Sequence, residues 1–231
     1  MRPMDFFPFL LFGGAFIALV VWFMARRRKS DRARARRLAE LGFFACPEEA
    51  DGLAEKITRL ENNSEYTFSV SRPMHASLDG RTVYYYLKSR SRQGHVIEVS
   101  EFLLPLKRRS TAGLVLWIKP SELLSSTAEK LIGAMATGAW DSQPDDLEKI
   151  EIPIDLRGGN LIGALAPRGY TLRDSIDSQA LEILQGIGDG GALIAMCRDE
   201  MCSLTAVSAR MPLDLDQLLP LIRRLIERQY G

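Results

Sequence analysis

Three carboxylates lie close together between Trp140 and Asp146, and they form the strongest candidate site for chemistry in this sequence. Asp141, Asp145 and Asp146 follow an aromatic ring, and clustered carboxylate oxygens can hold Mg²⁺ or Ca²⁺ or act as general acid and base. Their spacing matches no calcium-binding loop and defines no paired acid and base. A solvated acidic turn is the alternative explanation. Loop 141–146 is thus the candidate site if the protein is a hydrolase or a metal-dependent enzyme.

Two of the three cysteines predict a local pair. Four residues separate Cys197 from Cys202, and they read as a hairpin turn with Asp199 and Glu200 at its tip. Such a turn makes the two cysteines cross-strand partners with side chains on one face, within reach of a disulfide. In the cytoplasm we expect two free thiols.

The remaining metal-ligating residues show no recognised pattern. A zinc site at the cysteine pair would need two more ligands, and Cys46, His75 and His95 do not have the spacing to supply them. Neither histidine has an identifiable serine or cysteine partner for nucleophilic catalysis. The glycines from Gly186 to Gly191 follow a predicted helix and precede a strand, the reverse of a dinucleotide loop, so they predict a helix cap and a turn. We therefore expect no metal and no cofactor.

A tyrosine-rich and arginine-rich strand is the candidate surface for a protein partner. Tyr84, Tyr86, Arg90 and Arg92 lie within nine residues, and tyrosine and arginine are enriched at interface hot spots. The alternative is that β-strands favour tyrosine in any case.

The N-terminal part predicts a membrane anchor. Residues 6–25 carry no charge, and 20 helical residues match a hydrocarbon core about 30 Å thick. Basic residues follow the run, which places the N-terminus outside and the rest in the cytoplasm by the positive-inside rule. They form a candidate surface for anionic lipid headgroups: Arg26, Arg27, Arg28, Lys29, Arg32, Arg34, Arg36 and Arg37. The predicted partners are thus the bilayer, through residues 6–25, and an unknown protein.

The charge distribution argues against nucleic-acid binding. Residues 1–37 hold nine basic and two acidic side chains, which leaves 21 basic and 27 acidic ones over residues 38–231. A globular part with a net charge of −6 has no overall attraction for phosphates. We expect no nucleic-acid partner.

The register of one hairpin can be predicted from its turn. If Gln93 and Gly94 form a two-residue turn, strand positions pair so that their numbers sum to 187. That register places Tyr85 opposite Phe102 on an apolar face. It places Tyr86 opposite Glu101, and Lys88 opposite Val99, on the other face.

Periodicity predicts the remaining elements. We expect helices after Pro47, over residues 127–137 and 176–187, and at the C-terminus. Pro220 requires the last helix to start near Asp216. We expect strands at residues 66–71, 113–118, 150–154, 192–197 and 203–207. Strands come first in succession, and helices are interspersed without a βαβ rhythm. The predicted fold class is α+β, with one N-terminal transmembrane helix followed by a cytoplasmic domain that has a mainly antiparallel sheet and flanking helices.

Three segments resemble a family of uncharacterised single-pass bacterial membrane proteins: EFLLPLKRRSTAGLVLWIKP, ATGAWDSQPDDL and ILQGIGDGGALI. The resemblance implies a bacterial inner-membrane setting and no activity. The expected organisation is an anchor at 1–25, a basic linker at 26–42 and a cytoplasmic domain at 43–231. We expect a non-catalytic protein-interaction or scaffold module, with a membrane-tethered hydrolase or metal-dependent enzyme using loop 141–146 as the alternative.

Overall fold

The computed structural model describes part of the chain. The chain divides into two compact units. Described are Trp22, Lys29 and residues 32–107, 110–119, 144–156, 160–187, 193–206 and 215–230. The units are Met1–Phe43 and Phe44–Gly231.

The membrane part of the predicted fold class is wrong. No helix among the described residues is long and apolar enough to cross a membrane. The predicted span at residues 6–25 lies outside those residues, except for Trp22. The prediction relied on an uncharged run followed by basic residues, whereas the helical segment described in this unit, residues 32–40, is rich in charge.

The basic residues of the predicted headgroup surface are only partly described. Arg26, Arg27 and Arg28 lie outside the described residues; Lys29, Arg32, Arg36 and Arg37 are exposed and Arg34 is half-buried. Arg36 and Arg37 both form ion pairs with Glu40, at 3.5 and 3.1 Å. Pairs of this kind, three or four residues apart, support a helix that faces water.

The described residues of the unit from Phe44 to Gly231 form one nine-stranded sheet in which every pairing is antiparallel. Its order is β1-β2-β3-β4-β9-β8-β5-β7-β6. The strands are β1 (Phe44–Ala45), β2 (Thr67–Leu78), β3 (Arg81–Arg92), β4 (His95–Pro105), β5 (Leu114–Ile118), β6 (Glu148–Lys149), β7 (Leu161–Ala166), β8 (Leu193–Arg198) and β9 (Met201–Ala206). The antiparallel α+β part of the prediction agrees with this sheet.

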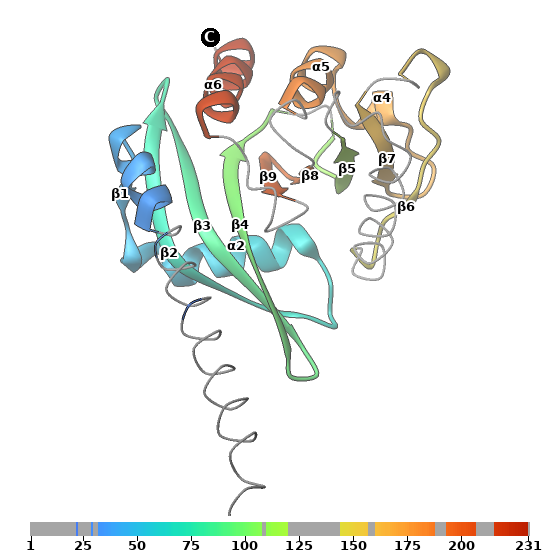
Figure 1. Ribbon diagram of the computed structural model, residues 1–231. Coiled ribbons are helices and arrows are strands. Elements are labelled where there is room, and N and C mark those ends of the chain that lie inside the picture. Colours follow the sequence, from blue (N-terminus) through green and yellow to red (C-terminus); the bar gives the residue numbers. More distant parts are fainter. Residues whose placement is uncertain are drawn as a thin grey trace, which may run out of the picture. The chain divides into compact units, whose positions relative to one another are not determined.

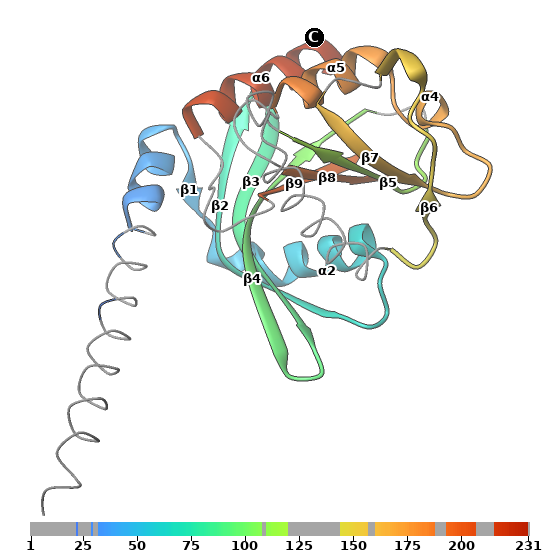
Figure 2. The same cartoon turned by 45° about the vertical axis from the view of Figure 1, so that its right-hand side comes forward.

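Helices cover both faces of the sheet. They are η2 (Pro47–Glu49), α2 (Ala50–Glu61), η3 (Ile154–Leu156), α4 (Leu172–Ser175), α5 (Ser178–Ile187) and α6 (Leu215–Tyr230). Within this unit, α2 lies on one side of the sheet and α5 and α6 lie on the other (Figures 1 and 2). Both sheet faces therefore contribute to a core.

The α2 face carries the first of these cores. Leu53, Ile57 and Leu60 recur at helical spacing along α2 and pack against Tyr86 of β3 and Leu103 of β4. On the opposite face, Val83, Tyr85, Phe102 and Leu104 are buried as well, as are Leu218, Ile222 and Leu225 of α6. The face that carries Tyr86, Lys88 and Glu101 is thus buried as well as the apolar face, because α2 covers it.

The predicted hairpin registers are confirmed. Tyr85 pairs with Phe102 and Arg92 with His95, so the numbers sum to 187 along the whole β3–β4 hairpin. Gln93 and Gly94 have φ values of 49° and 81°, the left-handed conformations that a tight hairpin turn of this kind needs.

The segment after residue 143 departs from the prediction in three places. The strand expected at 150–154 is absent: β6 ends at Lys149, η3 begins at Ile154, and β7 was not predicted. The helix expected at 176–187 is present as α5, which begins two residues later, at Ser178, whereas the short helix α4 before it was not predicted. α6 begins at Leu215, beside the start expected near Asp216, but Pro220 lies in the second turn and not in the first. Its missing N–H there removes an intrahelical hydrogen bond. The helix expected at 127–137 lies outside the described residues.

Candidate functional site

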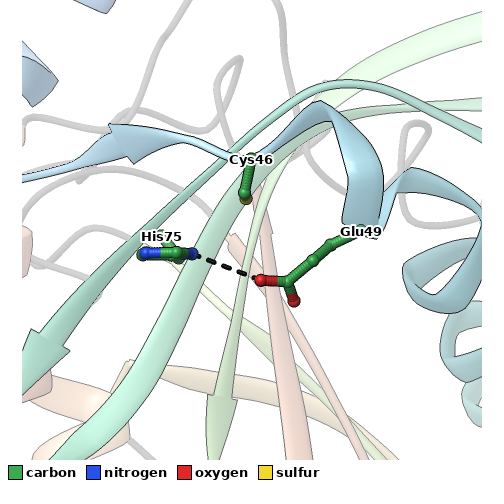
Figure 3. Close-up of side chains that lie close together, drawn as sticks. All are labelled: Cys46, Glu49 and His75. Atoms are coloured by element: carbon green, nitrogen blue, oxygen red, sulfur yellow. Dashed lines mark ion pairs between the residues drawn. The ribbon is translucent and has the colours of Figure 1, made fainter.

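Three metal-ligating side chains of different chemistry converge beside the β1 edge of the sheet. The ligand atoms of Cys46, Glu49 and His75 all lie within 4.8 Å of one another. Figure 3 shows them arriving from the residue after β1, from η2 and from β2. Cys46 and His75 have no recognised metal-ligand spacing in the sequence, and Glu49 was not among the predicted site residues, so this cluster was not predicted.

Local structure explains the approach of Cys46 to Glu49. Cys46 is the N-cap of η2, Pro47 is its first residue, and the Glu49 amide donates to the Cys46 carbonyl at 3.0 Å. Residues three apart are eclipsed in a 3₁₀ turn. Both side chains therefore point to the same side.

A β-bulge brings His75 to the cluster. The pairing of β2 with β3 shifts between Ser71 and Met74, where β2 holds one extra residue and Arg72 has φ 52°. Beyond the bulge, His75 pairs with Tyr84, on the α2 face. Without the extra residue, His75 would point to the other face of the sheet.

The cluster is half-enclosed. Cys46 is fully buried, whereas the side chains of His75 and Glu49 are 37% and 35% exposed. His75 Nδ1 lies 3.3 Å from Glu49 Oε1, but without hydrogen-bond geometry, and among the described residues this buried nitrogen has no hydrogen-bond partner. Burial, followed by the negative charges of Glu49 and Glu48, raises the pKa of the Cys46 thiol to about 11. The thiol is therefore protonated at neutral pH when no cation is bound.

Tyr84 supports two members of the cluster. Its ring meets the His75 ring edge to face, with centroids 6.3 Å apart. Burial raises the pKa of Tyr84 to about 12, with further contributions from its hydrogen bond to Glu49 and from the Glu49 charge. Lys56 Nζ lies 5.4 Å from the centroid of the same ring. This tyrosine, predicted as a partner surface, thus holds the cluster in place.

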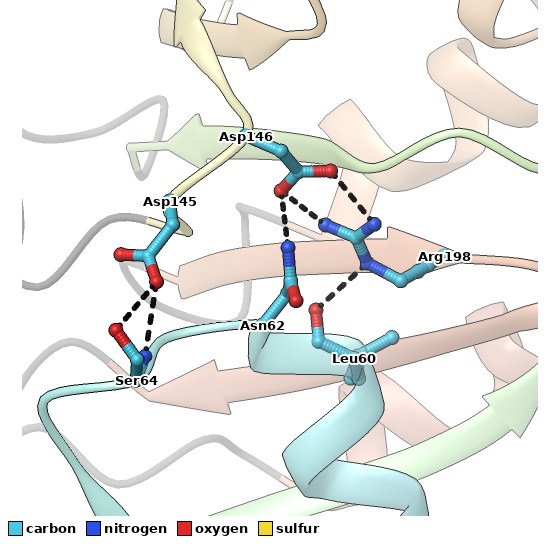
Figure 4. A network of polar contacts seen from close by, with 6 residues as sticks. All are labelled: Leu60, Asn62, Ser64, Asp145, Asp146 and Arg198. Carbon is cyan, nitrogen blue, oxygen red and sulfur yellow. Dashed lines mark hydrogen bonds and ion pairs between the residues drawn. The ribbon is translucent and has the colours of Figure 1, made fainter.

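The predicted acidic site is divided by the structure. Asp146 accepts two hydrogen bonds from the Arg198 guanidinium, at 2.7 and 2.9 Å, and one from the Asn62 amide at 2.8 Å (Figure 4). Asp145 Oδ2 accepts from the amide and the hydroxyl of Ser64, at 3.1 and 2.9 Å. Asp141 lies outside the described residues.

These contacts tie the acidic loop to the C-terminal end of α2. Arg198 also donates to the Leu60 carbonyl at 3.3 Å, and it thereby satisfies one of the last carbonyls of the helix. The bonds from Arg198, opposed by partial burial and assisted by Asn62, lower the pKa of Asp146. Asp145 and Asp146 both act in joining distant segments of the fold.

A buried charge cluster lies under α2. Lys88 of β3 forms ion pairs with Glu61 of α2 and with Glu101 of β4, the latter at 2.8 Å, and at most 6% of each side chain is exposed. Burial alone would lower the pKa of Lys88, but the charges of Glu101 and Glu61 outweigh it and raise the pKa. The hydroxyl of Tyr86, buried beside these carboxylates, also has its pKa raised.

The four residues predicted as a partner surface occupy different places. Tyr86 is fully buried, which corrects its inclusion in that surface: α2 covers it. Arg90 and Arg92 are half-buried and lie over the Tyr66 ring, at 5.3 and 5.6 Å from its centroid. Arg92 also pairs with Glu65 at 2.9 Å.

The predicted cysteine pair is present. Cys197 and Cys202 are cross-strand partners flanking a turn at Asp199 and Glu200, and Asp199 has φ 54°. Neither cysteine is in a disulfide, and both are fully buried, with their Sγ atoms 2.7 Å apart.

Comparison with known proteins adds no assignment, because no family model, no curated protein and no solved structure matches this chain.

Proposed function

We propose that the unit Phe44–Gly231 is a non-catalytic protein-interaction module, and that the distal part of the β3–β4 hairpin contacts the partner. We call residues 89–98 the arm. Figures 1 and 2 both show this hairpin running past α2, with its turn at the far end. Among the described residues, β9 pairs with β4 only from Glu101 to Pro105, so the arm projects beyond that pairing.

The observation that carries the proposal is the exposure of two apolar residues at the end of the arm. Val96 is 65% exposed and Ile97 is 47% exposed. They are adjacent in a strand, so they point to opposite faces of the ribbon. Full burial of such a side chain is worth about 1.5–3 kcal/mol. A partner that enclosed the tip of the arm would bury Val96 on one face and Ile97 on the other, and part of this free energy from each would favour binding.

The residues around Ile97 indicate the chemistry of the partner. Ile97 is the cross-strand partner of Arg90, so it shares a face with Arg90 and Arg92. Arginines that flank an apolar contact favour carboxylates in the bound surface. We therefore propose a protein segment that combines aliphatic side chains with Asp or Glu.

Photo-crosslinking from the arm tests this function. A photoreactive amino acid is placed at position 97 of the full chain, and adducts are compared with those from position 154. Ile154 is the matched control because it is 80% exposed and apolar but lies in η3. We expect a discrete adduct from position 97 that Arg92→Glu removes, and no such adduct from position 154.

Two results would refute the proposal. One is the absence of any discrete adduct from positions 96 and 97. The other is an identical set of adducts from position 154, which would indicate non-specific contact with exposed apolar side chains.

The contacts of Asp145 and Asp146 also favour a non-catalytic role. Both carboxylates accept hydrogen bonds that join loop 144–147 to α2 and β8. Using either one as an acid, base or metal ligand would require breaking a contact that holds the fold together.

A further inference from the structure

The cluster of Cys46, Glu49 and His75 combines three ligand types that protein zinc sites use. A thiolate sulfur, an imidazole nitrogen and a carboxylate oxygen are each common zinc ligands. Mg²⁺ and Ca²⁺ prefer sites made of oxygen ligands, so this set disfavours them. The donors come from the residue after β1, from η2 and from β2, and thus from segments that a bound ion would link.

The separations suit a single ion. Nitrogen and oxygen ligands at about 2.0–2.1 Å from a tetrahedral Zn²⁺ lie about 3.3–3.4 Å from each other. The distance from His75 Nδ1 to Glu49 Oε1 is 3.3 Å. A sulfur at about 2.3 Å from the ion would lie about 3.6 Å from either ligand. All three ligand atoms already lie within 4.8 Å of one another, so a shift of about 1.2 Å at most closes the site.

An unsatisfied polar atom points to the same ligand. His75 Nδ1 is buried, and within the described part of the chain it has no hydrogen-bond partner. Buried polar atoms are almost always satisfied, so such an exception calls for an explanation. A metal ion would accept the lone pair of this nitrogen.

The surroundings supply the outer contacts that metal sites require. Tyr84 hydrogen-bonds to Glu49 and packs edge to face against His75. Such outer partners orient the ligands and fix their positions. The thiolate of Cys46 and the carboxylate of Glu49 would together balance the charge of a divalent ion.

We propose that Cys46, Glu49 and His75 bind one Zn²⁺ ion, with a fourth coordination position open to water. The partial exposure of Glu49 and His75 gives solvent access to that position. This site is independent of the arm, and the proposed function does not depend on it.

Titration of the full chain with Zn²⁺ against a chromophoric chelator tests the proposal. We expect one tightly bound ion per chain, and a fall in affinity of at least about 100-fold for Cys46→Ser and for His75→Gln, since loss of an outer partner alone costs 10–100-fold. Tyr84→Phe, which removes an outer partner, should lower the affinity for Zn²⁺ by about 10–100-fold. The matched control is His95→Gln, the other histidine of the chain; it should bind Zn²⁺ as the unaltered chain does.

Co²⁺ in place of Zn²⁺ gives a readout that does not require a variant to fold. The unaltered chain should show a thiolate-to-metal charge-transfer band and the visible bands of tetrahedral Co²⁺. Absence of the charge-transfer band, or its loss in Cys197→Ser with retention in Cys46→Ser, would overturn the proposal. So would Zn²⁺ binding by folded His75→Gln with unchanged affinity.

Discussion

Replacing Lys88 with methionine should destabilise the protein strongly. Lys88 is the cation between two buried carboxylates, and Lys88→Met keeps most of the volume of the side chain while it removes the charge. Glu61 and Glu101 would then face each other with no compensating charge, at 6% and 0% exposure. Breaking a buried ion pair by removing one partner costs about 3–5 kcal/mol. That is a large share of the roughly 5–15 kcal/mol by which a domain is stable.

Urea unfolding followed by circular dichroism measures this effect. The matched control is Lys149→Met, an exposed lysine in β6, which should change the free energy of unfolding by no more than about 0.5 kcal/mol. Glu101→Gln should lower the free energy of unfolding less than Lys88→Met does, because it leaves Lys88 and Glu61 as a pair with no net charge. If Lys88→Met lowers the free energy of unfolding by less than about 1 kcal/mol, and its dependence on urea concentration keeps the same slope, water reaches the cluster and the reasoning is refuted.

Three further predictions concern the other contacts. The folded-state pKa of Asp146 is lowered from its ordinary value of 3.8, so its carboxylate stabilises the fold above that pH, and this stabilisation is lost as the pH falls through the lowered pKa. The unaltered chain should therefore have a higher urea midpoint than Asp146→Asn at neutral pH, and the difference should disappear in acid. A difference that does not change with pH would contradict this. Mild oxidation of the purified chain should form the Cys197–Cys202 bridge first, by peptide mapping, because the strands hold both thiols together; a dominant bridge from either one to Cys46 would count against the structure. Gly113→Ala should lower stability by about 1–3 kcal/mol in the same urea assay, since a Cβ would lie 2.7 Å from the Arg198 guanidinium; an unchanged midpoint would mean that this packing is loose.

Features set by local turns were predictable from the sequence. A two-residue turn at Gln93 and Gly94 determines the register of the whole hairpin, and a second one at Asp199 and Glu200 determines the pairing of Cys197 with Cys202. In both cases the geometry depends on a few consecutive residues.

Features that depend on distant segments were not predictable. The alternation of side chains along a strand places Lys88 and Glu101 on the face opposite Tyr85 and Phe102, and only the position of α2 shows that this face is also buried. His75 reaches Cys46 through the pairing of the two-residue strand β1 and through a bulge in β2, neither of which leaves a periodic signal. The acidic loop looked like a site because its partners, Arg198 among them, are far away in the sequence.

The central claim is that the arm binds a protein partner, and the affinity of that partner tests it most directly. The segment recovered from the adduct at position 97 is purified and its binding to the full chain is measured by calorimetry. The proposal predicts a loss of at least about 10-fold for Ile97→Asp, equivalent to about 1.4 kcal/mol, and no change for Ile154→Asp. Equal affinity of the unaltered chain and Ile97→Asp would contradict the proposal.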